Sequence, residues 1–323
     1  MMDKLLDIKG LTVHYVTEDG TVHAINDLNM SLGSGEIMGL VGETGAGKTT
    51  TALSIMRLVP DPPGKTICGE IYFEGEDLLL KKESDMRKVR GNKISMIFQD
   101  PMTSLNPVLT VRDQISEVIA LHENLNMKEV RQKADEMLLK VGIQKERAKE
   151  YPHQFSGGMR QRVVIAIALA CNPSLLIADE PTTALDVTIQ AQVLELMKEL
   201  KKEYNTAMIM ITHDLGIVAD ICDKVAIMYA GNIVEQGTKE DIFENPKHPY
   251  TIGLFNSIPD VDKIESSLTP IKGLMPDPTD LPPGCPFHPR CDSAMLECAE
   301  KSAKVVAVSE THHVKCLLIN EGA

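Results

Sequence analysis

The chain has 323 residues, 43% of them hydrophobic, with 33 Lys and Arg against 46 Asp and Glu. That length suits about two domains, and the apolar content suffices for a sizeable core. The formal net charge of −13 argues against nucleic-acid binding through the overall field, because such binding needs a basic surface to neutralise phosphates.

The N-terminal segment and the length of the apolar runs predict the cellular location of the chain. Residues 1–7 lack the apolar core and small-residue cleavage site of a signal peptide, so we expect a cytoplasmic protein. The longest unbroken apolar run, Val163 to Cys171, has nine residues, whereas a bilayer-spanning helix needs about 20. Any role at a membrane is therefore expected to depend on partner subunits.

Two groups of β-rich runs indicate the fold class. Near the N-terminus, Leu11–Tyr15 and Ile71–Phe73 predict a small antiparallel sheet. Five further runs are each followed by a helical pattern: Glu36–Val41, Ile94–Phe98, Leu175–Asp179, Met208–Thr212 and Val225–Tyr229. Runs such as Leu175–Asp179 are apolar on both faces, as strands covered by helices on both sides must be. We therefore predict an α/β fold with an antiparallel β subdomain.

A glycine-rich segment follows the first of these five strands. Its sequence, GETGAGKT over 42–49, matches the pattern G-x-x-x-x-G-K-[ST] between a strand and a helix. Glycines let backbone N–H groups surround phosphate oxygens, and the helix N-terminus adds a favourable dipole. We therefore predict a P-loop NTPase core in which Lys48 reaches the β- and γ-phosphates of ATP and Thr49 binds Mg²⁺. The residues expected to contact nucleotide here are Gly42, Glu43, Thr44, Gly45, Ala46, Gly47, Lys48, Thr49 and Thr50.

A long stretch rich in helix-forming residues separates the strands at Ile94–Phe98 and Leu175–Asp179. Met127–Val141 is an example, and no comparable β-rich run interrupts the stretch. We predict an inserted helical subdomain over about residues 100–170, within a nucleotide-binding domain that spans residues 1–245.

A second glycine-rich turn precedes an apolar helix expected over Val163–Ala170. Here Ser156 is expected to cap the helix N-terminus, and Gly157 and Gly158 expose N–H groups at its positive end. The turn is thus a second candidate anion site, one without a lysine.

A buried strand then ends in two carboxylates. Asp179 is placed to hold Mg²⁺, directly or through water. Because side chains alternate along a strand, Glu180 faces the other way and is available to orient or deprotonate an attacking water. The alternative is that Asp179 and Glu180 are merely a solvated acidic pair at the end of an ordinary strand. The phosphate loop upstream disfavours that interpretation.

Together these motifs resemble the ATP-binding cassette (ABC) family, whose signature is an [LF]-S-G-G-[QM] element. The resemblance implies that two cassettes dimerise head to tail, with each ATP between the phosphate loop of one protomer and the signature of the other. It also implies roles for four further residues. Tyr15 would stack on adenine, Gln99 would sense Mg²⁺ and the attacking water, and Asp186 would contact the opposite protomer. His213 would act as a switch at the γ-phosphate.

The composition changes near residue 245. Ten of the eighteen prolines lie between Pro246 and Pro289, which excludes long helices and regular sheet there. We therefore predict a C-terminal extension rich in Pro and Cys over residues 246–323. It contains four of the seven cysteines, namely Cys285, Cys291, Cys298 and Cys316.

The spacing of these four cysteines, C-x5-C-x6-C-x17-C, leaves several readings open. Structural zinc sites usually begin with closely spaced pairs, whereas four separated thiolates fit iron–sulfur ligation at least as well. Free thiols are the third alternative, and His288, His312 or His313 could replace a ligand. The other three cysteines, Cys68, Cys171 and Cys222, lack partners at metal spacing and are predicted to be packed thiols.

Several segments resemble one branch of the family, the oligopeptide and dipeptide importers. They are DPMTSLNP after Gln99, the FSGGMRQR form of the signature, HPYT at 248–251 and LPPGCPFHPRC at 281–291. The resemblance covers essentially the whole chain and favours a [4Fe–4S] cluster over zinc in the extension. It implies an ATPase at the cytoplasmic face of the membrane, with a second ATPase (a copy or a paralogue), two membrane subunits and, indirectly, an extracytoplasmic binding protein.

Two other functions compete with a peptide importer. The same ATPase could serve nickel complexes, oligosaccharides or antimicrobial peptides, because an ATPase does not touch the cargo. A cassette ATPase of repair or translation is disfavoured, since this chain has one cassette, no long coiled-coil insertion and a negative charge.

Overall fold

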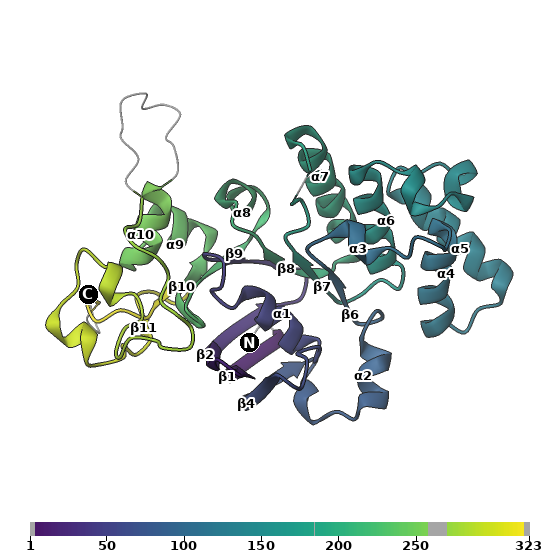
Figure 1. The fold of residues 1–323 in the computed structure, drawn as a ribbon. Coiled ribbons are helices and arrows are strands. Elements are labelled where there is room, and N and C mark those ends of the chain that lie inside the picture. Colours follow the sequence, from purple (N-terminus) through teal and green to yellow (C-terminus); the bar gives the residue numbers. More distant parts are fainter. Residues whose placement is uncertain (1–3, 184, 258–269, 320–323) are drawn as a thin grey trace. The chain divides into compact units, whose positions relative to one another are not determined.

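The computed structural model describes residues 4–183, 185–257 and 270–319 (Figure 1). The chain divides into two compact units. Unit 1 comprises Met1–Leu5, Leu32–Ile37 and Leu78–Ile211, and unit 2 comprises Leu6–Ser31, Met38–Asp77 and Thr212–Ala323. The main chain therefore passes between the units several times, and each is described by itself.

Unit 1 contains a parallel sheet of three buried strands. They are β6 (Ile94–Ile97), β7 (Leu175–Asp179) and β8 (Ala207–Ile211), with β7 in the middle. Every residue of the three strands is buried, which explains why their sequences lack the polar alternation of a half-exposed sheet. Leu78–Leu80 (η1) and α2 (Glu83–Val89) precede β6, while α7 (Val187–Tyr204) connects β7 to β8.

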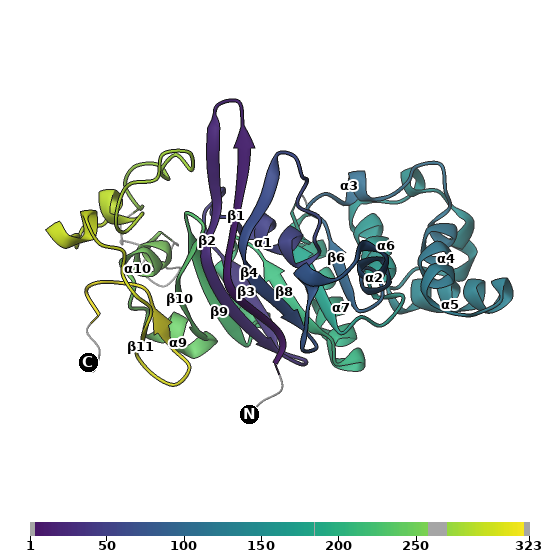
Figure 2. The same ribbon diagram turned by 90° about the horizontal axis from the view of Figure 1, so that it is seen from below.

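Helices occupy the stretch between β6 and β7 (Figure 2). Their bounds are α3 (Pro101–Ser104), α4 (Val111–His122), α5 (Met127–Lys140), η2 (Lys145–Lys149), η3 (Pro152–Gln154) and α6 (Gly157–Leu169). A capping box stabilises the N-terminus of α5. The Asn126 side chain accepts a hydrogen bond from the N–H of Glu129, and the Glu129 carboxylate accepts one from the N–H of Asn126. The helical stretch predicted from the sequence is thus present, and the predicted segment Met127–Val141 corresponds to α5 and its C-cap, Val141.

Unit 2 contains an antiparallel sheet in the order β2-β1-β4-β5. Its strands are β1 (Lys4–Thr17), β2 (Gly20–Gly33), β4 (Gly64–Phe73) and β5 (Glu76–Asp77), and Figure 2 shows β1 beside β2 as a long hairpin. A register shift interrupts the pairing of β1 with β4 near Thr12 and Cys68. Cys68 is exposed at this point, so the prediction of a packed thiol was wrong there, whereas Cys171 and Cys222 are buried.

A second group of strands in unit 2 carries the phosphate loop. The buried strand β3 (Ile37–Val41) pairs in parallel with β9 (Lys224–Tyr229), and β9 pairs with β10 (Asn232–Thr238) in an antiparallel hairpin. Two short strands of the C-terminal extension, β12 (His313–Val314) and β11 (Val306–Ala307), continue from β10. The helices of this unit are α1 (Lys48–Ile55), α8 (Leu215–Ile221), α9 (Lys239–Glu244), α10 (Pro249–Asn256), η4 (His288–Arg290) and η5 (Leu296–Ala299).

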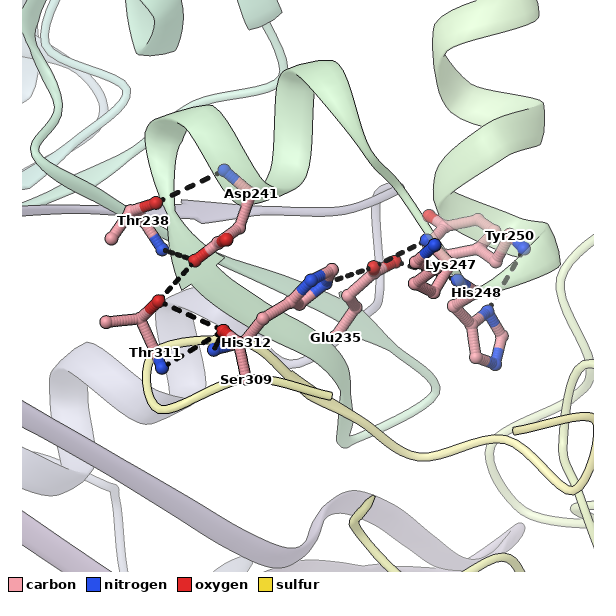
Figure 3. A network of polar contacts seen from close by, with 9 residues as sticks. All are labelled: Glu235, Thr238, Asp241, Lys247, His248, Tyr250, Ser309, Thr311 and His312. Carbon is pink, nitrogen blue, oxygen red and sulfur yellow. Dashed lines mark hydrogen bonds and ion pairs between the residues drawn. The ribbon is translucent and has the colours of Figure 1, made fainter. Parts of the chain in front are cut away.

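A buried polar network fastens the extension to β10 (Figure 3). Glu235 is fully buried, and its carboxylate accepts hydrogen bonds from the N–H groups of Lys247 and His248 at 2.7 and 2.9 Å. His312 Nε2 lies 2.7 Å from Glu235 Oε1 and is itself buried. His248 Nδ1 in turn accepts from the N–H of Tyr250, which caps α10. One carboxylate therefore ties the start of the proline-rich region and the segment after it to the same strand.

All five predicted core strands are present with bounds within one or two residues of the prediction, and the fold is mixed α/β. The C-terminal extension is present as well, with little regular structure between α10 and β11 in the part that is described. Among the described residues, no helix combines the length and apolar character that crossing a bilayer requires.

Candidate functional site

The phosphate loop follows β3 directly and is wound too tightly for side chains at two of its glycines. A Cβ on Gly42 would lie 2.1 Å from the carbonyl oxygen of Met228. Gly47 has a φ of +105°, and a Cβ there would lie 2.4 Å from the carbonyl oxygen of Ala24. The loop can close only with glycine at both positions, which accounts for the spacing of the motif.

Lys48 begins α1 and folds back over this loop. Its side chain is buried, and Nζ donates to the carbonyl oxygens of Gly42 and Glu43 at 2.8 and 2.9 Å. The contacts keep the ammonium at the loop, while Thr44, Gly45 and Thr49 are exposed beside it. Backbone N–H groups, a helix N-terminus and one lysine are what a polyphosphate needs for binding.

Tyr15 lies on β1 in the same unit as the phosphate loop. Its ring is half-buried, and its hydroxyl lies 3.4 Å from Oγ1 of Thr50 in the first turn of α1. The hydroxyl therefore lies beside the first turn of α1, and stacking on adenine stays a prediction.

A second group of predicted residues gathers at the end of β7 in unit 1. Asp179 is buried, and the next residue, Glu180, has a φ of +47°, an unusual conformation for a non-glycine residue. Glu180 Oε2 accepts hydrogen bonds from Gln99 Nε2 at 3.0 Å and from Thr183 Oγ1 at 2.9 Å. Two residues predicted separately, Gln99 and Glu180, thus touch, and Thr183 joins them although the sequence analysis did not single it out.

The signature turn is built as the start of α6. The Ser156 side chain accepts from the N–H of Met159 at 3.4 Å, which confirms the predicted N-cap. A Cβ on Gly158 would lie 2.3 Å from Cγ2 of Ile189 on α7, so glycine allows α6 and α7 to pack closely here. Ser156 and Gly157 are exposed, so their polar groups face outward.

The remaining predicted residues lie in short connections. Asp186 caps α7 by accepting from the N–H of Ile189 at 3.0 Å, whereas Ala184, of the same predicted contact loop, lies outside the described residues. His213 is exposed in the connection that leads to α8. Their roles toward a partner protomer and the γ-phosphate stay predictions.

The four cysteines of the extension lie near one another in unit 2. The N–H of Cys285 donates to the carbonyl oxygen of Cys298 at 2.8 Å. Burial raises the pKa of the Cys316 thiol, a backbone hydrogen bond from Leu318 lowers it, and the nearby Cys285, Cys291 and Cys298 raise it. Within the described ranges, however, no group of three or more His, Cys, Asp or Glu side chains converges to hold a single metal ion.

Comparisons with known proteins identify the family. Residues 25–183 match the model of the ABC transporter family, and residues 234–298 match that of the oligopeptide/dipeptide transporter C-terminal region. Among solved structures, the chain is similar to the dimeric post-hydrolysis state of the ATP-binding cassette MJ0796 bound to ADP and Pi (27% identity, TM-score 0.65, covering 72% of this chain and 98% of that one). It is also similar to cbiO1 from Clostridium perfringens, part of the transporter complex cbiONQ (30%, TM-score 0.64, covering 78% and 95%).

The chain is thus an ABC-type ATPase. Its curated relatives narrow the class: it is 50% identical to the oligopeptide transport ATP-binding protein AppD of Bacillus subtilis, over 99% of this chain and 98% of AppD. It is 50% identical to the dipeptide transport ATP-binding protein DppD of the same organism (100% and 97%) and 52% identical to the oligopeptide transport ATP-binding protein OppD of Escherichia coli (92% and 88%). The chain belongs to the ATP-binding subunits of oligopeptide/dipeptide ABC transporters.

Proposed function

We propose that this chain is the ATP-hydrolysing subunit of an importer of dipeptides or oligopeptides and works at the cytoplasmic face of a membrane. The observation that carries the proposal is full-length similarity, extension included, to ATP-binding proteins named for peptides. Those names favour peptides over nickel complexes or oligosaccharides. We keep the sequence-based division into a nucleotide-binding domain (1–245) and an extension (246–323).

Hydrolysis requires charge stabilisation around the γ-phosphate, where the transition state spreads negative charge over the equatorial oxygens. In our proposal Lys48 contacts the β- and γ-phosphates. Thr49, Asp179 and Gln99 would hold Mg²⁺, whose charge offsets that of the phosphates. His213 and the Ser156-Gly157-Gly158 turn of a second cassette would be the remaining groups that stabilise the negative charge of the γ-phosphate.

Glu180 is proposed to activate the attacking water. Two donors, Gln99 Nε2 and Thr183 Oγ1, hold the Glu180 carboxylate through its Oε2 atom, and the carboxylate would accept a proton from the attacking water. Because the groups around the γ-phosphate come from two cassettes, ATP would stabilise the closed dimer, and hydrolysis would let the two cassettes separate.

Glu180→Gln tests this assignment. The amide cannot take up a proton, so ATP binding should persist and trap a dimer while turnover falls by at least a hundredfold. Glu195→Gln is the matched control, because Glu195 lies exposed on α7 and should leave turnover unchanged. Near-normal hydrolysis by Glu180→Gln would remove Glu180 from this role.

Cargo is tested in cells whose only copy of the chain carries Lys48→Ala. Peptide uptake should stop while nickel and oligosaccharide uptake continue, because only the peptide importer depends on this ATPase. Unchanged peptide uptake would refute the cargo assignment.

The four thiols are proposed to bind a [4Fe–4S] cluster. The hydrogen bond between the backbones of Cys285 and Cys298 brings two of the four segments together, which supports this. Each thiolate of such a cluster binds a different iron, so the sulfurs need not converge as around one zinc ion. Cys291→Ser should lose iron and sulfide on anaerobic purification, with Cys68→Ser as control because Cys68 is exposed and distant in sequence. Full metal content in Cys291→Ser would exclude Cys291 as a ligand.

A further inference from the structure

Arg290 of the C-terminal extension forms an ion pair with the side chain of Glu43 in the phosphate loop. Arg290 Nη1 and Nη2 donate to Glu43 Oε2 and Oε1 at 2.8 and 3.1 Å, a two-pronged ion pair. The Arg290 side chain is only 7% exposed, against 29% for Glu43. Two further hydrogen bonds hold the Arg290 guanidinium in place. Its Nε donates to the carbonyl oxygen of Lys272 at 2.9 Å, and its Nη1 donates to the hydroxyl of Tyr229 at 3.3 Å.

The extension holds the backbone of the same residue through Tyr250. The hydroxyl of Tyr250 accepts from the N–H of Glu43 at 3.0 Å, and the Tyr250 side chain is fully buried. Its ring packs against Tyr229 of β9 and against Phe287, with ring centroids 4.6 and 5.3 Å apart. The first turn of α10, where Tyr250 lies, is capped by His248, a member of the Glu235 network (Figure 3).

Glu43 needs such a partner for an electrostatic reason. It is the second residue of the phosphate loop, so its negative charge belongs to the segment that is proposed to bind a polyphosphate. A negative charge there repels an anionic ligand, and the chain as a whole carries −13. A planar guanidinium that pairs with both carboxylate oxygens cancels this charge and fixes its direction.

We propose that Arg290 and Tyr250 are positioning residues for the phosphate loop: they neutralise and orient Glu43 and thereby raise the affinity for ATP. This inference rests on the proposed nucleotide site. Arg290 lies between Cys285 and Cys291, so the conformation of the cysteine segment sets where the guanidinium stands. The extension is in this way linked to nucleotide binding by direct contacts.

The test is a double-mutant cycle on the full-length chain, with ATP affinity measured by calorimetry. Arg290→Ala should weaken ATP binding about tenfold, because it exposes the ligand to the unpaired Glu43 carboxylate. In the Glu43→Gln background, the same change should cost less than about twofold, since no charge is left to neutralise. Arg131→Ala removes an equal charge from an exposed position on α5 in unit 1 and should leave the affinity unchanged.

Two further variants keep the fold while altering single contacts. Arg290→Lys retains the charge without the two-pronged geometry and should weaken binding less than Arg290→Ala. Tyr250→Phe keeps the ring, loses the acceptor for the Glu43 N–H, and should weaken ATP binding about threefold.

The outcomes separate the possible explanations. Unchanged affinity in Arg290→Ala overturns the inference, as does an equal loss in both Glu43 backgrounds, which would reveal a general structural effect. Failure of the unmodified chain to bind ATP would instead refute the proposed function itself.

Discussion

The buried pair of Glu235 and His312 offers a quantitative prediction about how the extension is held. His312→Ala removes one of three hydrogen bonds to a carboxylate that has no access to solvent, while the N–H groups of Lys247 and His248 remain. A hydrogen bond to a charged group contributes about 1.5–3 kcal/mol. Because the Glu235 carboxylate is buried but keeps two donors, we expect a cost at the upper end of this range, about 3 kcal/mol.

Hydrogen exchange measured by mass spectrometry reports this cost locally. A loss of about 3 kcal/mol corresponds to about a 150-fold fall in amide protection, which we expect for peptides covering residues 235–250. Peptides from the sheet of unit 1 should keep their protection, because they do not share the network. His313→Ala is the matched control, since the neighbouring histidine makes no contact with Glu235 among the interactions described.

Two results would refute this reasoning. Protection of residues 235–250 that stays within about tenfold of the unmodified chain would show that Glu235 does not need His312. An equal loss in His313→Ala would show that the effect belongs to the short strand rather than to the buried pair.

Three further predictions concern binding, pH and thiol reactivity. Lys48→Ala should weaken ATP binding at least a hundredfold in calorimetry, and an unchanged affinity would contradict the phosphate-loop assignment. Burial lowers the pKa of His248 from 6.5 to about 4, so between these values the unfolded state takes up a proton that the folded state does not. Stability should therefore fall by up to about 3 kcal/mol as the pH drops through this window, measured by urea unfolding. His248→Asn, which keeps a capping acceptor, should flatten that slope, and an unaltered slope would exclude His248 as its source. Burial raises the pKa of Cys171 to about 11 and of Cys222 to about 12, so iodoacetamide should label the exposed Cys68 well before either; simultaneous labelling would contradict their burial.

The core strands were predictable because each is a short apolar run in a continuous stretch of chain. A strand buried on both faces must be apolar throughout, and this condition can be read without knowing its neighbours. β2 was missed, although Leu28, Met30 and Leu32 alternate with polar residues as a half-buried strand requires. The short strands β11 and β12 were missed for another reason: they have two residues each, and they exist only because β10 offers an edge.

The residues of the candidate site were predictable to different degrees. The phosphate loop was found directly, since its glycines and lysine lie within eight consecutive residues and their chemistry depends on local backbone geometry. Glu180 was singled out because it follows a buried strand, and Gln99 through resemblance to the family. Their contact across 81 residues depends on the pairing of β6 with β7, which no local pattern specifies.

Sequence alone therefore determined the class of fold, the phosphate loop and the family, because these depend on apolar patterns and on short motifs. Tertiary structure decided what the extension contacts. Arg290 and Tyr250 were visible as parts of branch-specific motifs, but their contacts with Glu43 span 247 and 207 residues. A side-chain contact between residues so far apart is set by how the intervening strands and helices pack, and that packing is a property of the folded chain as a whole.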